Sequence, residues 1–549
     1  MPDSCLLPDL VARSARRCPE SVALIHGRDS MTYGALREAI VRFAGGIADL
    51  SLSRGERVAI YLEKRFETVI ASFGAPAAGC VFVPLNPLLK PGQVAHILRD
   101  CGARVLVTSP ERHALLAETL TSCADLRHVV LAGDDSPQTR SGDYSRIGWN
   151  SLLAMPPRPG HRVIDADMAA ILYTSGSTGQ PKGVVLSHRN MMAGAKSVAE
   201  YLDNTADDIL LAALPLSFDA GFSQLTTAFH VGARVVLLNY LLPRDVLKVL
   251  ERERVTGLTA VPPLFVQLAR LDWPAAIAAH LRYFASTGGR LPRETLTALR
   301  ARLPQTKPFL MYGLTEAFRS TFLPPDEIDR RPDSIGKAIP NAEILVLRED
   351  GAPCAPHEPG ELVHRGALVA LGYWNDPEKT AERFKPLPAG TPGREPGLTI
   401  PEPAVWSGDT VRMDEEGFLY FVGRRDEMIK TSGYRVSPTE VEEILYATRR
   451  VGECVAFGVD HPVLGQAIQV IVTPPENHSV EFDVEALMEE CRKHMPAYMA
   501  PQGIAVRQGP LPRNPNGKID RKALAAQWNE AARMMENAAT TETRNEKTD

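Results

Sequence analysis

Short apolar runs alternate with helix-like segments along the first half of the chain. From about residue 56, runs rich in β-branched residues are separated by stretches with the spacing of an amphipathic helix, such as 93–99. This alternation favours a mostly parallel sheet covered by helices on both faces, and therefore an α/β fold. Residues 134–160 are polar and contain proline and glycine, which predicts a surface loop. The strand candidates are 58–62, 81–85, 104–108, 128–132, 169–173, 209–213, 233–238 and 281–286.

The pattern changes between residues 334 and 424. Polar and apolar residues now alternate with period two, as they do in antiparallel strands with one buried face. The Asp-Glu-Glu-Gly sequence at 414–417 predicts a hairpin connection between the last two of these strands. The alternating segments are 342–347, 360–365, 410–413 and 418–422.

A smaller α+β unit begins after about residue 426. A capping box at 437–440, with proline at the first helical position, precedes apolar residues with helical spacing. A second helix is predicted around 484–491, where the apolar side chains share one face. Residues 531–549 lack apolar periodicity, which predicts a disordered tail. The predicted domains are therefore 1–424, 425–530 and the tail 531–549.

Composition narrows the class of protein. With 61 basic and 66 acidic residues, the formal net charge is −5, which gives no electrostatic reason to expect nucleic acid. The eight cysteines form no C-x-x-C pair, which argues against a zinc site or a disulfide framework and suits a reducing compartment. Neither a signal peptide nor an apolar run of about 18 residues is visible, so we expect a cytoplasmic protein with no transmembrane segment.

The strongest candidate for chemistry is the segment 173–184, which reads YTSGSTGQPKGV. Glycine lets the backbone approach a ligand closely, and backbone N–H groups, hydroxyls and an ammonium provide the donors that a polyphosphate needs. A plain surface turn is the alternative. The segment is not a Walker A loop, because Lys182 follows Pro181 and precedes Gly183. The predicted phosphate-binding residues are Thr174, Ser175, Gly176, Ser177, Thr178, Gly179 and Lys182.

Other segments carry polar residues that suit a nucleotide reaction. Within 312–316, Thr315 offers a hydroxyl to an α-phosphate, and Glu316 offers a carboxylate to its Mg²⁺. The alternative is that these two residues only begin a helix. Asp409 lies at the start of a predicted strand, where its carboxylate could accept both ribose hydroxyls. A turn aspartate is the commoner explanation of such a residue. Basic residues on predicted turns lie in 423–430 and 514–521.

Together and in this order, these segments resemble the AMP-forming acyl-CoA synthetases, an adenylate-forming superfamily that includes luciferases and the adenylation domains of peptide synthetases. The resemblance covers roughly residues 20–525. It implies a large N-terminal domain of stacked, mostly parallel sheets flanked by helices, with a distorted β-barrel at about 334–424. A small, mobile α+β domain would follow. Within the superfamily, the chain is most similar to the acyl-CoA ligases associated with the exosortase system, on the segments 86–91, 311–319 and 331–341.

The resemblance implies a two-step reaction that uses ATP and Mg²⁺. A carboxylate attacks the α-phosphate to give an acyl-adenylate and pyrophosphate, and a thiol then displaces AMP. The thiol would be that of CoA or, in the alternative, the phosphopantetheine of a separate carrier protein that receives an acyl or amino-acid group. A non-catalytic ligand-binding relative is the third possibility. The implied partners are a small carboxylate, ATP and CoA.

The resemblance also gives each candidate residue a role. Lys518 would reach from the small domain to the reacting carboxylate, and Glu316 would hold Mg²⁺. The predicted catalytic residues are Lys518, Lys430, Thr315 and Glu316. The nucleotide site would add Gly288, Gly289, Arg290, Tyr312, Gly313, Asp409 and Arg424 to the phosphate loop. On the thiol side, Asp426 matches the hinge, and Lys430, Ser432, Gly433 and Tyr434 match the second catalytic face.

The acyl pocket is expected near Phe218, Asp219, Ser223 and Ser286. Fatty- and aryl-CoA ligases usually carry histidine at the position of Phe218. With Phe218 followed by Asp219, this chain instead resembles amino-acid adenylation domains, in which the aspartate pairs with the α-amino group of the substrate. Instead of pairing with a substrate amine, Asp219 could cap the following helix or meet solvent. The basic Arg290 would favour an anionic substrate.

Overall fold

The computed structural model divides into two compact units. The first comprises Met1–Leu291, Leu299–Ser407 and Met413–Tyr420, and the second comprises Pro292–Ala298, Gly408–Arg412 and Phe421–Asp549. The structure describes residues 5–133, 138–141, 143–156, 158–174, 181–391, 394, 397, 399–424, 427–431, 434–461, 464–475, 482–495, 497–515 and 517–531.

One sheet of the first unit has nine strands among the described residues, in the order β20-β10-β9-β4-β3-β5-β6-β8-β7. Its centre, from β4 to β8, is parallel, as the strand–helix alternation predicts. β9 and β10 form an antiparallel pair beside it. The strands are β3 (Arg57–Tyr61), β4 (Val81–Pro84), β5 (Ala103–Thr108), β6 (His128–Leu131), β7 (Thr139–Ser141), β8 (Tyr144–Gly148), β9 (Met168–Thr174), β10 (Lys182–Ser187) and β20 (Gly372–Tyr373).

The surface loop predicted at 134–160 is wrong in part. β7, β8 and the short helix α6 (Trp149–Leu153) lie within it. β8 pairs in parallel with β6, with Ser145 opposite His128, and Trp149 is buried. The segment is polar because β7 and β8 are the last two strands at one edge of the sheet, so its order comes from pairing rather than from apolar periodicity.

The second sheet has fourteen strands among the described residues. Its main path is β18-β19-β22-β23-β17-β16-β15-β14-β13-β11-β12-β1-β2, and β21 pairs with β22. The strands from β15 to β1 along this path are parallel, whereas β15 to β17 and β18 with β19 are antiparallel. The strands are β1 (Val22–His26), β2 (Asp29–Thr32), β11 (Ile209–Ala212), β12 (Arg234–Leu237), β13 (Gly257–Ala260), β14 (Tyr283–Ser286), β15 (Lys307–Tyr312), β16 (Thr321–Leu323), β17 (Ser334–Ala338), β18 (Ala342–Leu347), β19 (Gly360–Gly366), β21 (Phe384–Pro386), β22 (Pro403–Met413) and β23 (Leu419–Arg424).

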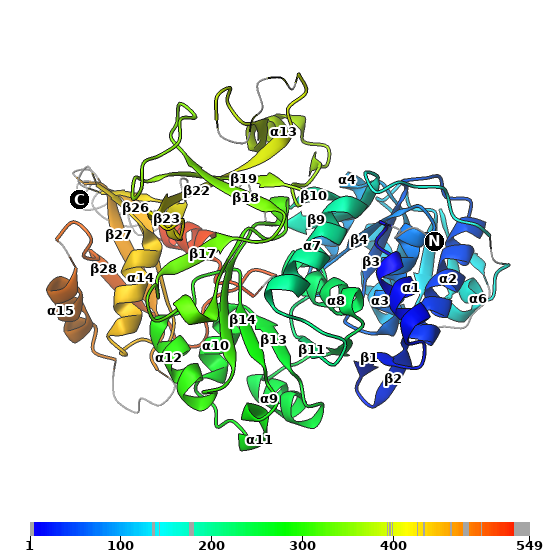
Figure 1. Ribbon diagram of the computed structural model, residues 1–549, viewed down its shortest axis with the longest axis horizontal. Coiled ribbons are helices and arrows are strands. Elements are labelled where there is room, and N and C mark those ends of the chain that lie inside the picture. Colours follow the sequence, from blue (N-terminus) through cyan, green and yellow to red (C-terminus); the bar gives the residue numbers. More distant parts are fainter. Residues whose placement is uncertain are drawn as a thin grey trace, which may run out of the picture. The chain divides into compact units, whose positions relative to one another are not determined.

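Two helices, α7 (His188–Tyr201) and α8 (Asp219–Val231), pack against each other between the two sheets (Figure 1). α7 contacts β9 and β10 of the first sheet, and α8 contacts β11 and β12 of the second. The segment that precedes α8 can pass this helix closely only because Gly221 has no side chain, since a Cβ there would lie 1.9 Å from the carbonyl oxygen of Pro215. The other helices of this part of the chain are α1 (Asp9–Arg17), α2 (Tyr33–Asp49), α3 (Phe66–Ala77), α4 (Pro91–Asp100), α5 (Pro110–Leu120), α9 (Pro243–Arg252), α10 (Pro262–Leu268), α11 (Ala275–Ala278), α12 (Arg293–Arg302) and α13 (Pro377–Arg383), with 3-10 turns η1 (Thr315–Ala317) and η2 (Pro325–Glu327).

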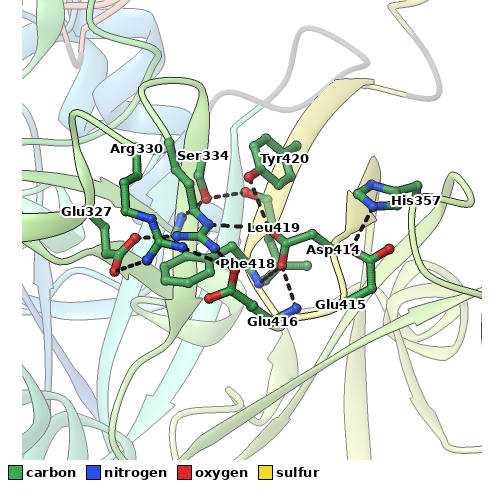
Figure 2. A network of polar contacts seen from close by, with 12 residues as sticks. Glu327, Arg330, Ser334, His357, Asp414, Glu415, Glu416, Phe418, Leu419 and Tyr420 are labelled. Atoms are coloured by element: carbon green, nitrogen blue, oxygen red, sulfur yellow. Dashed lines mark hydrogen bonds and ion pairs between the residues drawn. The ribbon is translucent and has the colours of Figure 1, made fainter.

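A polar network holds the predicted hairpin at 414–417 (Figure 2). Asp414 accepts hydrogen bonds from the backbone of Glu416 and Phe418 and from the Tyr420 hydroxyl, at 3.1, 2.8 and 3.0 Å. Arg331 lies 4.1 Å from the centre of the Phe418 ring and also pairs with the Asp414 carboxylate. Burial opposes ionisation of Asp414, but these hydrogen bonds and Arg331 together lower its pKa. The hairpin that the sequence predicts is confirmed.

The second unit contains a five-stranded sheet among its described residues. Its order is β25-β24-β27-β26, with β28 beside β27. Helix α14 (Pro438–Ala447) begins at the predicted proline, and α15 (Val484–His494) includes the second predicted segment. Arg521 joins Glu427 and Glu442 at 2.7 and 2.8 Å within this unit. The strands are β24 (Ile429–Thr431), β25 (Tyr434–Val436), β26 (Cys454–His461), β27 (Gly465–Val472) and β28 (Gly503–Val506).

Candidate functional site

The predicted phosphate loop joins β9 to β10, which pair antiparallel. Thr174 ends β9 and lies opposite Lys182, the first residue of β10. The antiparallel pairing therefore brings the two ends of the loop together on one side of the sheet. The loop residues Ser175, Gly176, Ser177, Thr178 and Gly179 lie outside the described residues.

Lys182 lies beside an aromatic ring and other cations. Its Nζ is 5.6 Å from the centre of the Tyr373 ring. Burial, followed by the nearby Lys379 ammonium, lowers the pKa of Lys182 to about 8. An anion at this position would reverse that effect, because a negative charge stabilises the ammonium. The electrostatics of Lys182 thus suit an anionic ligand.

Glu316 contacts the hydroxyl of the same tyrosine. It belongs to η1, which follows β15, and the Tyr373 hydroxyl donates a 2.6 Å hydrogen bond to its Oε1. The backbone N–H of Ala370 donates to the Glu316 carbonyl at 2.9 Å. Thr315, in the same turn, is 8% exposed. The structure therefore brings Lys182 and Glu316, predicted from segments far apart in the sequence, to one tyrosine.

The turn after Glu316 has an unusual backbone. Phe318 has φ +60° and ψ −60°, and the Arg319 N–H donates a 2.7 Å bond to the Ala317 carbonyl, which together define a γ-turn. Positive φ is strained for a bulky side chain, and such strain is often found at functional sites. The Phe318 ring is buried against α7, where Gly194 leaves room for it. This turn lets the chain return from Glu316 into β16, which pairs antiparallel with β15.

The residues predicted to border the adenine lie at the ends of β14 and β15. Gly288 has φ +82°, which favours glycine, and it follows Ser286 at the end of β14. Arg290 forms a 2.5 Å ion pair with Asp333. Its charge is therefore balanced within the protein, which weakens the expectation that Arg290 selects an anionic substrate. Gly289, Tyr312 and Gly313 also lie in the segments that follow β14 and end β15.

Asp409 and Arg424 are neighbours in the second unit. The Arg424 Nε lies 3.1 Å from Oδ1 of Asp409, and the carboxylate side chain is 11% exposed whereas the guanidinium side chain is 41% exposed. Asp409 lies on β22 and Arg424 ends β23. Carboxylate oxygens accept hydrogen bonds, which is what two ribose hydroxyls require.

The other predicted residues of the second unit that the structure describes are Lys518, Lys430 and Tyr434. The Lys518 N–H donates to Oδ1 of Asn514 at 3.1 Å, and the Asn514 N–H donates to the Lys518 carbonyl at 2.8 Å, so Lys518 lies on a tight turn. Lys430 belongs to β24, and Tyr434 begins β25, opposite Thr431. Asp426, Ser432 and Gly433 lie outside the described residues.

The predicted pocket residue Asp219 forms a buried ion pair that the sequence analysis missed. Asp219 Oδ2 lies 3.5 Å from the NH1 nitrogen of Arg319, and each side chain is 3% exposed. Asp219 is therefore not a solvent-exposed carboxylate. Arg319 closes the 311–319 segment and lies three residues after Glu316, which was the only signal that could have pointed to it.

A small cavity adjoins this pair. It has a volume of about 10 Å³, and Ser223 and Ala220 of α8 lie on its wall with Arg319. Phe218, the N-cap residue of α8, and Ser286 are buried but are not on this wall. The polar residues of the wall are Ser223, Gln224, Thr227, Thr259, Tyr283 and Arg319.

Mg²⁺ fits this site as a partner of the nucleotide. Among the described residues, no group of three or more histidines, cysteines or acidic residues could hold a metal ion. Mg²⁺ is usually bound through one or two carboxylates together with substrate phosphates, rather than by a cage made only of protein ligands. The Glu316 carboxylate therefore meets the requirement. Over the described part of the chain, no helix is both long and apolar enough to cross a bilayer.

Comparisons with known proteins identify the family of this chain. The sequence profile of the AMP-binding enzymes matches residues 11–374, and that of the AMP-binding enzyme C-terminal domain matches 440–518. A long-chain-fatty-acid–CoA ligase of Salmonella typhimurium is 30% identical and covers 94% of both chains. An L-proline–[L-prolyl-carrier protein] ligase of Streptomyces coelicolor is 32% identical and covers 91% of this chain and 92% of its own.

Solved structures show the same fold. The anthranilate CoA ligase AuaEII, in complex with anthranoyl-AMP, has a TM-score of 0.84 at 25% identity and covers 96% of this chain and 98% of its own. The o-succinylbenzoate CoA synthetase of Bacillus subtilis, in complex with ATP and magnesium, has a TM-score of 0.77 at 26% identity. It covers 93% of this chain and 98% of its own. The predicted α/β fold, with its large N-terminal and small C-terminal domains, is confirmed.

Proposed function

The chain belongs to the family of AMP-binding enzymes, and from this premise we propose that it activates a carboxylic acid with ATP and transfers the acyl group to CoA. The observation that carries the proposal is the convergence of Lys182, at the end of the glycine-rich hairpin, and Glu316 on Tyr373. A cation over the ring and a carboxylate at its hydroxyl provide the two charges that a Mg²⁺-bound triphosphate requires.

In the first step, a carboxylate oxygen of the substrate attacks the α-phosphorus, and the bond to the pyrophosphate oxygen breaks. Negative charge gathers on the oxygens around phosphorus, so fixed cations and donors lower the barrier. Lys182 and the 174–179 loop would hold the β- and γ-phosphates, Thr315 would contact the α-phosphate, and Glu316 would hold Mg²⁺. The Asp409 carboxylate would accept the ribose hydroxyls beside Arg424.

In the second step, the thiol sulfur attacks the acyl carbon, the bond to AMP breaks, and the thiol proton passes to water. Lys518 would serve the first step, and Lys430 and Tyr434 would serve the second. Asp426 would be the hinge at which the small domain turns between the two steps.

CoA is the acceptor that this proposal favours, with a carrier protein as the alternative. Relatives of both kinds cover more than nine tenths of the chain. An α-amino acid substrate is disfavoured by the structure, since the Asp219 carboxylate already pairs with Arg319. We further propose that the chain is an exosortase-associated ligase, on the segments 86–91, 311–319 and 331–341. We also propose that it is cytoplasmic, because its eight cysteines form no C-x-x-C pair and suit a reducing compartment.

Lys518→Ala tests the proposal directly. Loss of one contact that stabilises charge in the transition state typically lowers the rate about 10²–10³-fold. We therefore expect acid-dependent release of pyrophosphate to fall by this factor while ATP binding, measured by calorimetry, is retained. Lys493→Ala is the matched control, because Lys493 is 70% exposed on α15 of the same unit. Near-normal pyrophosphate release by Lys518→Ala would refute the role of this lysine.

A further inference from the structure

The cavity between α7, α8 and β13 has polar groups that no described residue satisfies. Gln224 Oε1, Thr227 Oγ1 and Arg319 Nε are buried and form no hydrogen bond to any described residue. The three residues are 5%, 2% and 2% exposed, and all three line the cavity. Buried polar atoms are nearly always paired, so several unpaired atoms around one space point to a ligand or to water.

The Arg319–Asp219 pair sets the charge of this cavity. The NH1–Oδ2 distance of 3.5 Å is long for an ion pair, and a single contact of this kind leaves the Arg319 Nε available. Because the two charges cancel, neither an anionic nor a cationic group would find an unbalanced partner. The remaining groups are a guanidinium N–H, a hydroxyl and an amide oxygen, which include both donors and an acceptor.

The volume sets the size of the group that fits. About 10 Å³ is close to the least space that can hold one water molecule. A single hydroxyl group has this size and can both donate and accept hydrogen bonds. An alkyl chain would leave the polar atoms unpaired and would displace the Arg319 side chain.

The cavity lies within reach of the proposed reaction centre. Arg319 is four residues after Thr315, and four residues span at most about 14 Å. The γ-turn at Phe318 reverses the chain between them. An acid whose carboxylate reacts beside Thr315 could therefore place the other end of its chain beside Arg319.

We infer that this cavity receives the far end of the acyl group, and that Arg319 and Asp219 select a short acid whose tail carries a neutral hydroxyl. The inference rests on the proposed function and specifies its substrate class. Arg319 acts here as a specificity residue, with the unpaired oxygens of Gln224 and Thr227 completing the recognition of the hydroxyl.

Acid-dependent pyrophosphate exchange with matched acids tests the inference. The probes are 4-hydroxybutyrate and 6-hydroxyhexanoate, each compared with its methyl-ended analogue (pentanoate, heptanoate), its carboxylate-ended analogue (succinate, adipate) and its ammonium-ended analogue (4-aminobutyrate, 6-aminohexanoate). Palmitate represents long apolar acids. A site that hydrogen-bonds a substrate hydroxyl rejects the analogue without it strongly, so we expect kcat/KM to favour one hydroxy acid over its methyl analogue by about 10²-fold or more.

The double variant Asp219→Leu with Arg319→Met provides the second measurement. Removing either charge alone would leave the other buried and unpaired, whereas replacing both with apolar side chains is often tolerated. We expect the double variant to fold and to favour the methyl-ended acid. Arg104→Met, which removes an ion pair with Glu56 on the nine-stranded sheet, should leave the acid preference of the wild type unchanged.

The outcomes separate the inference from the proposed function. Equal or better use of pentanoate, heptanoate or palmitate by the wild type, or an unchanged preference in the double variant, overturns the inference but leaves acid activation in place. Preference for a charged tail also overturns it. If no acid supports exchange in a protein that binds ATP, the proposed function itself fails, and the inference fails with it.

Discussion

The Tyr373 hydroxyl donates a 2.6 Å hydrogen bond to the Glu316 carboxylate, while the face of its ring lies 5.6 Å from the Lys182 ammonium. Burial and the neighbouring Glu316 raise the pKa of Tyr373, so the phenol keeps its proton and remains a donor. One side chain thereby positions both the proposed Mg²⁺ ligand and the proposed phosphate ligand. Tyr373 is a positioning residue in this arrangement.

Tyr373→Phe should weaken the use of Mg²⁺. A hydrogen bond to a charged group contributes about 1.5–3 kcal/mol, so losing it should raise the Mg²⁺ concentration for half-maximal pyrophosphate release by roughly 10–100-fold. Because the ring remains, the contact with Lys182 is retained, and saturating Mg²⁺ should restore most of the rate. Tyr144→Phe, which removes a hydroxyl contact with His113 on the nine-stranded sheet, is the control. An unchanged Mg²⁺ titration would contradict the positioning role.

Gly194→Ala should disturb the γ-turn from a distance. A Cβ at position 194 would lie 2.4 Å from two atoms of the buried Phe318 ring, closer than real contacts allow. Overpacking of this kind typically destabilises a protein by about 1–3 kcal/mol, measurable by urea unfolding. Since the ring fixes the turn that follows Glu316, the rate of adenylation should fall as well.

Gly92→Ala is the matched control for this change. Gly92 also lies in a helix, and a Cβ there would meet nothing within 4 Å. We expect this variant to keep the stability and the activity of the wild type. Wild-type adenylation in a folded Gly194→Ala variant would show that the packing of Phe318 does not control the site.

Much of the fold could be predicted from the sequence because the strands are short and apolar. The predicted strand at 209–213 is β11, Ile209–Ala212, and the run at 169–173 lies within β9, Met168–Thr174. The segment 139–153 was missed for the opposite reason, since β7 and β8 are polar strands at a sheet edge. Their order depends on the pairing of β8 with β6 and of β7 with β8, which local sequence does not encode.

The site shows the same division. Lys182, Thr315 and Glu316 could be predicted because polar residues in a glycine-containing segment indicate a binding site by themselves. No knowledge of the residues that they contact in the fold is needed. Asp219 was recognised as a candidate, but its partner Arg319 lies 100 residues further along the chain. Only the packing of α8 against the turn after Glu316 brings the two charges together, so the choice between an amine ligand and an internal partner required the structure.

Asp426→Pro should separate the two half-reactions, if the hinge proposal is right. Proline fixes φ and removes a donor, so it restricts the backbone rotation that domain alternation needs. We expect acid-dependent pyrophosphate release to continue, while formation of the CoA thioester falls sharply. Release of pyrophosphate and formation of thioester should be measured on the same preparation. Equal loss of both would count against alternation at this position.

Lys64 predicts a specific dependence of stability on pH. Its Nζ donates to the carbonyl oxygens of Ala213 and Leu214, in the segment that leads to α8. Burial lowers the pKa of Lys64 from its ordinary value of 10.5 to about 8. The unfolded chain therefore binds more protons than the folded chain between these two values, and the free energy of unfolding should rise as the pH increases from about 8 to about 10.5.

The lowered pKa of Lys64 also sets the size of this pH-dependent rise in the free energy of unfolding. At about 1.4 kcal/mol per pKa unit, the rise attributable to Lys64 is roughly 3 kcal/mol. Urea unfolding of the wild type and of Lys64→Met at several pH values should show this rise in the difference between the two proteins, since all other groups titrate in both. Lys248→Met, at a side chain that is 69% exposed on α9, should run parallel to the wild type. Parallel pH profiles for wild type and Lys64→Met would mean that the buried ammonium keeps its ordinary pKa and is fully stabilised by the two carbonyls.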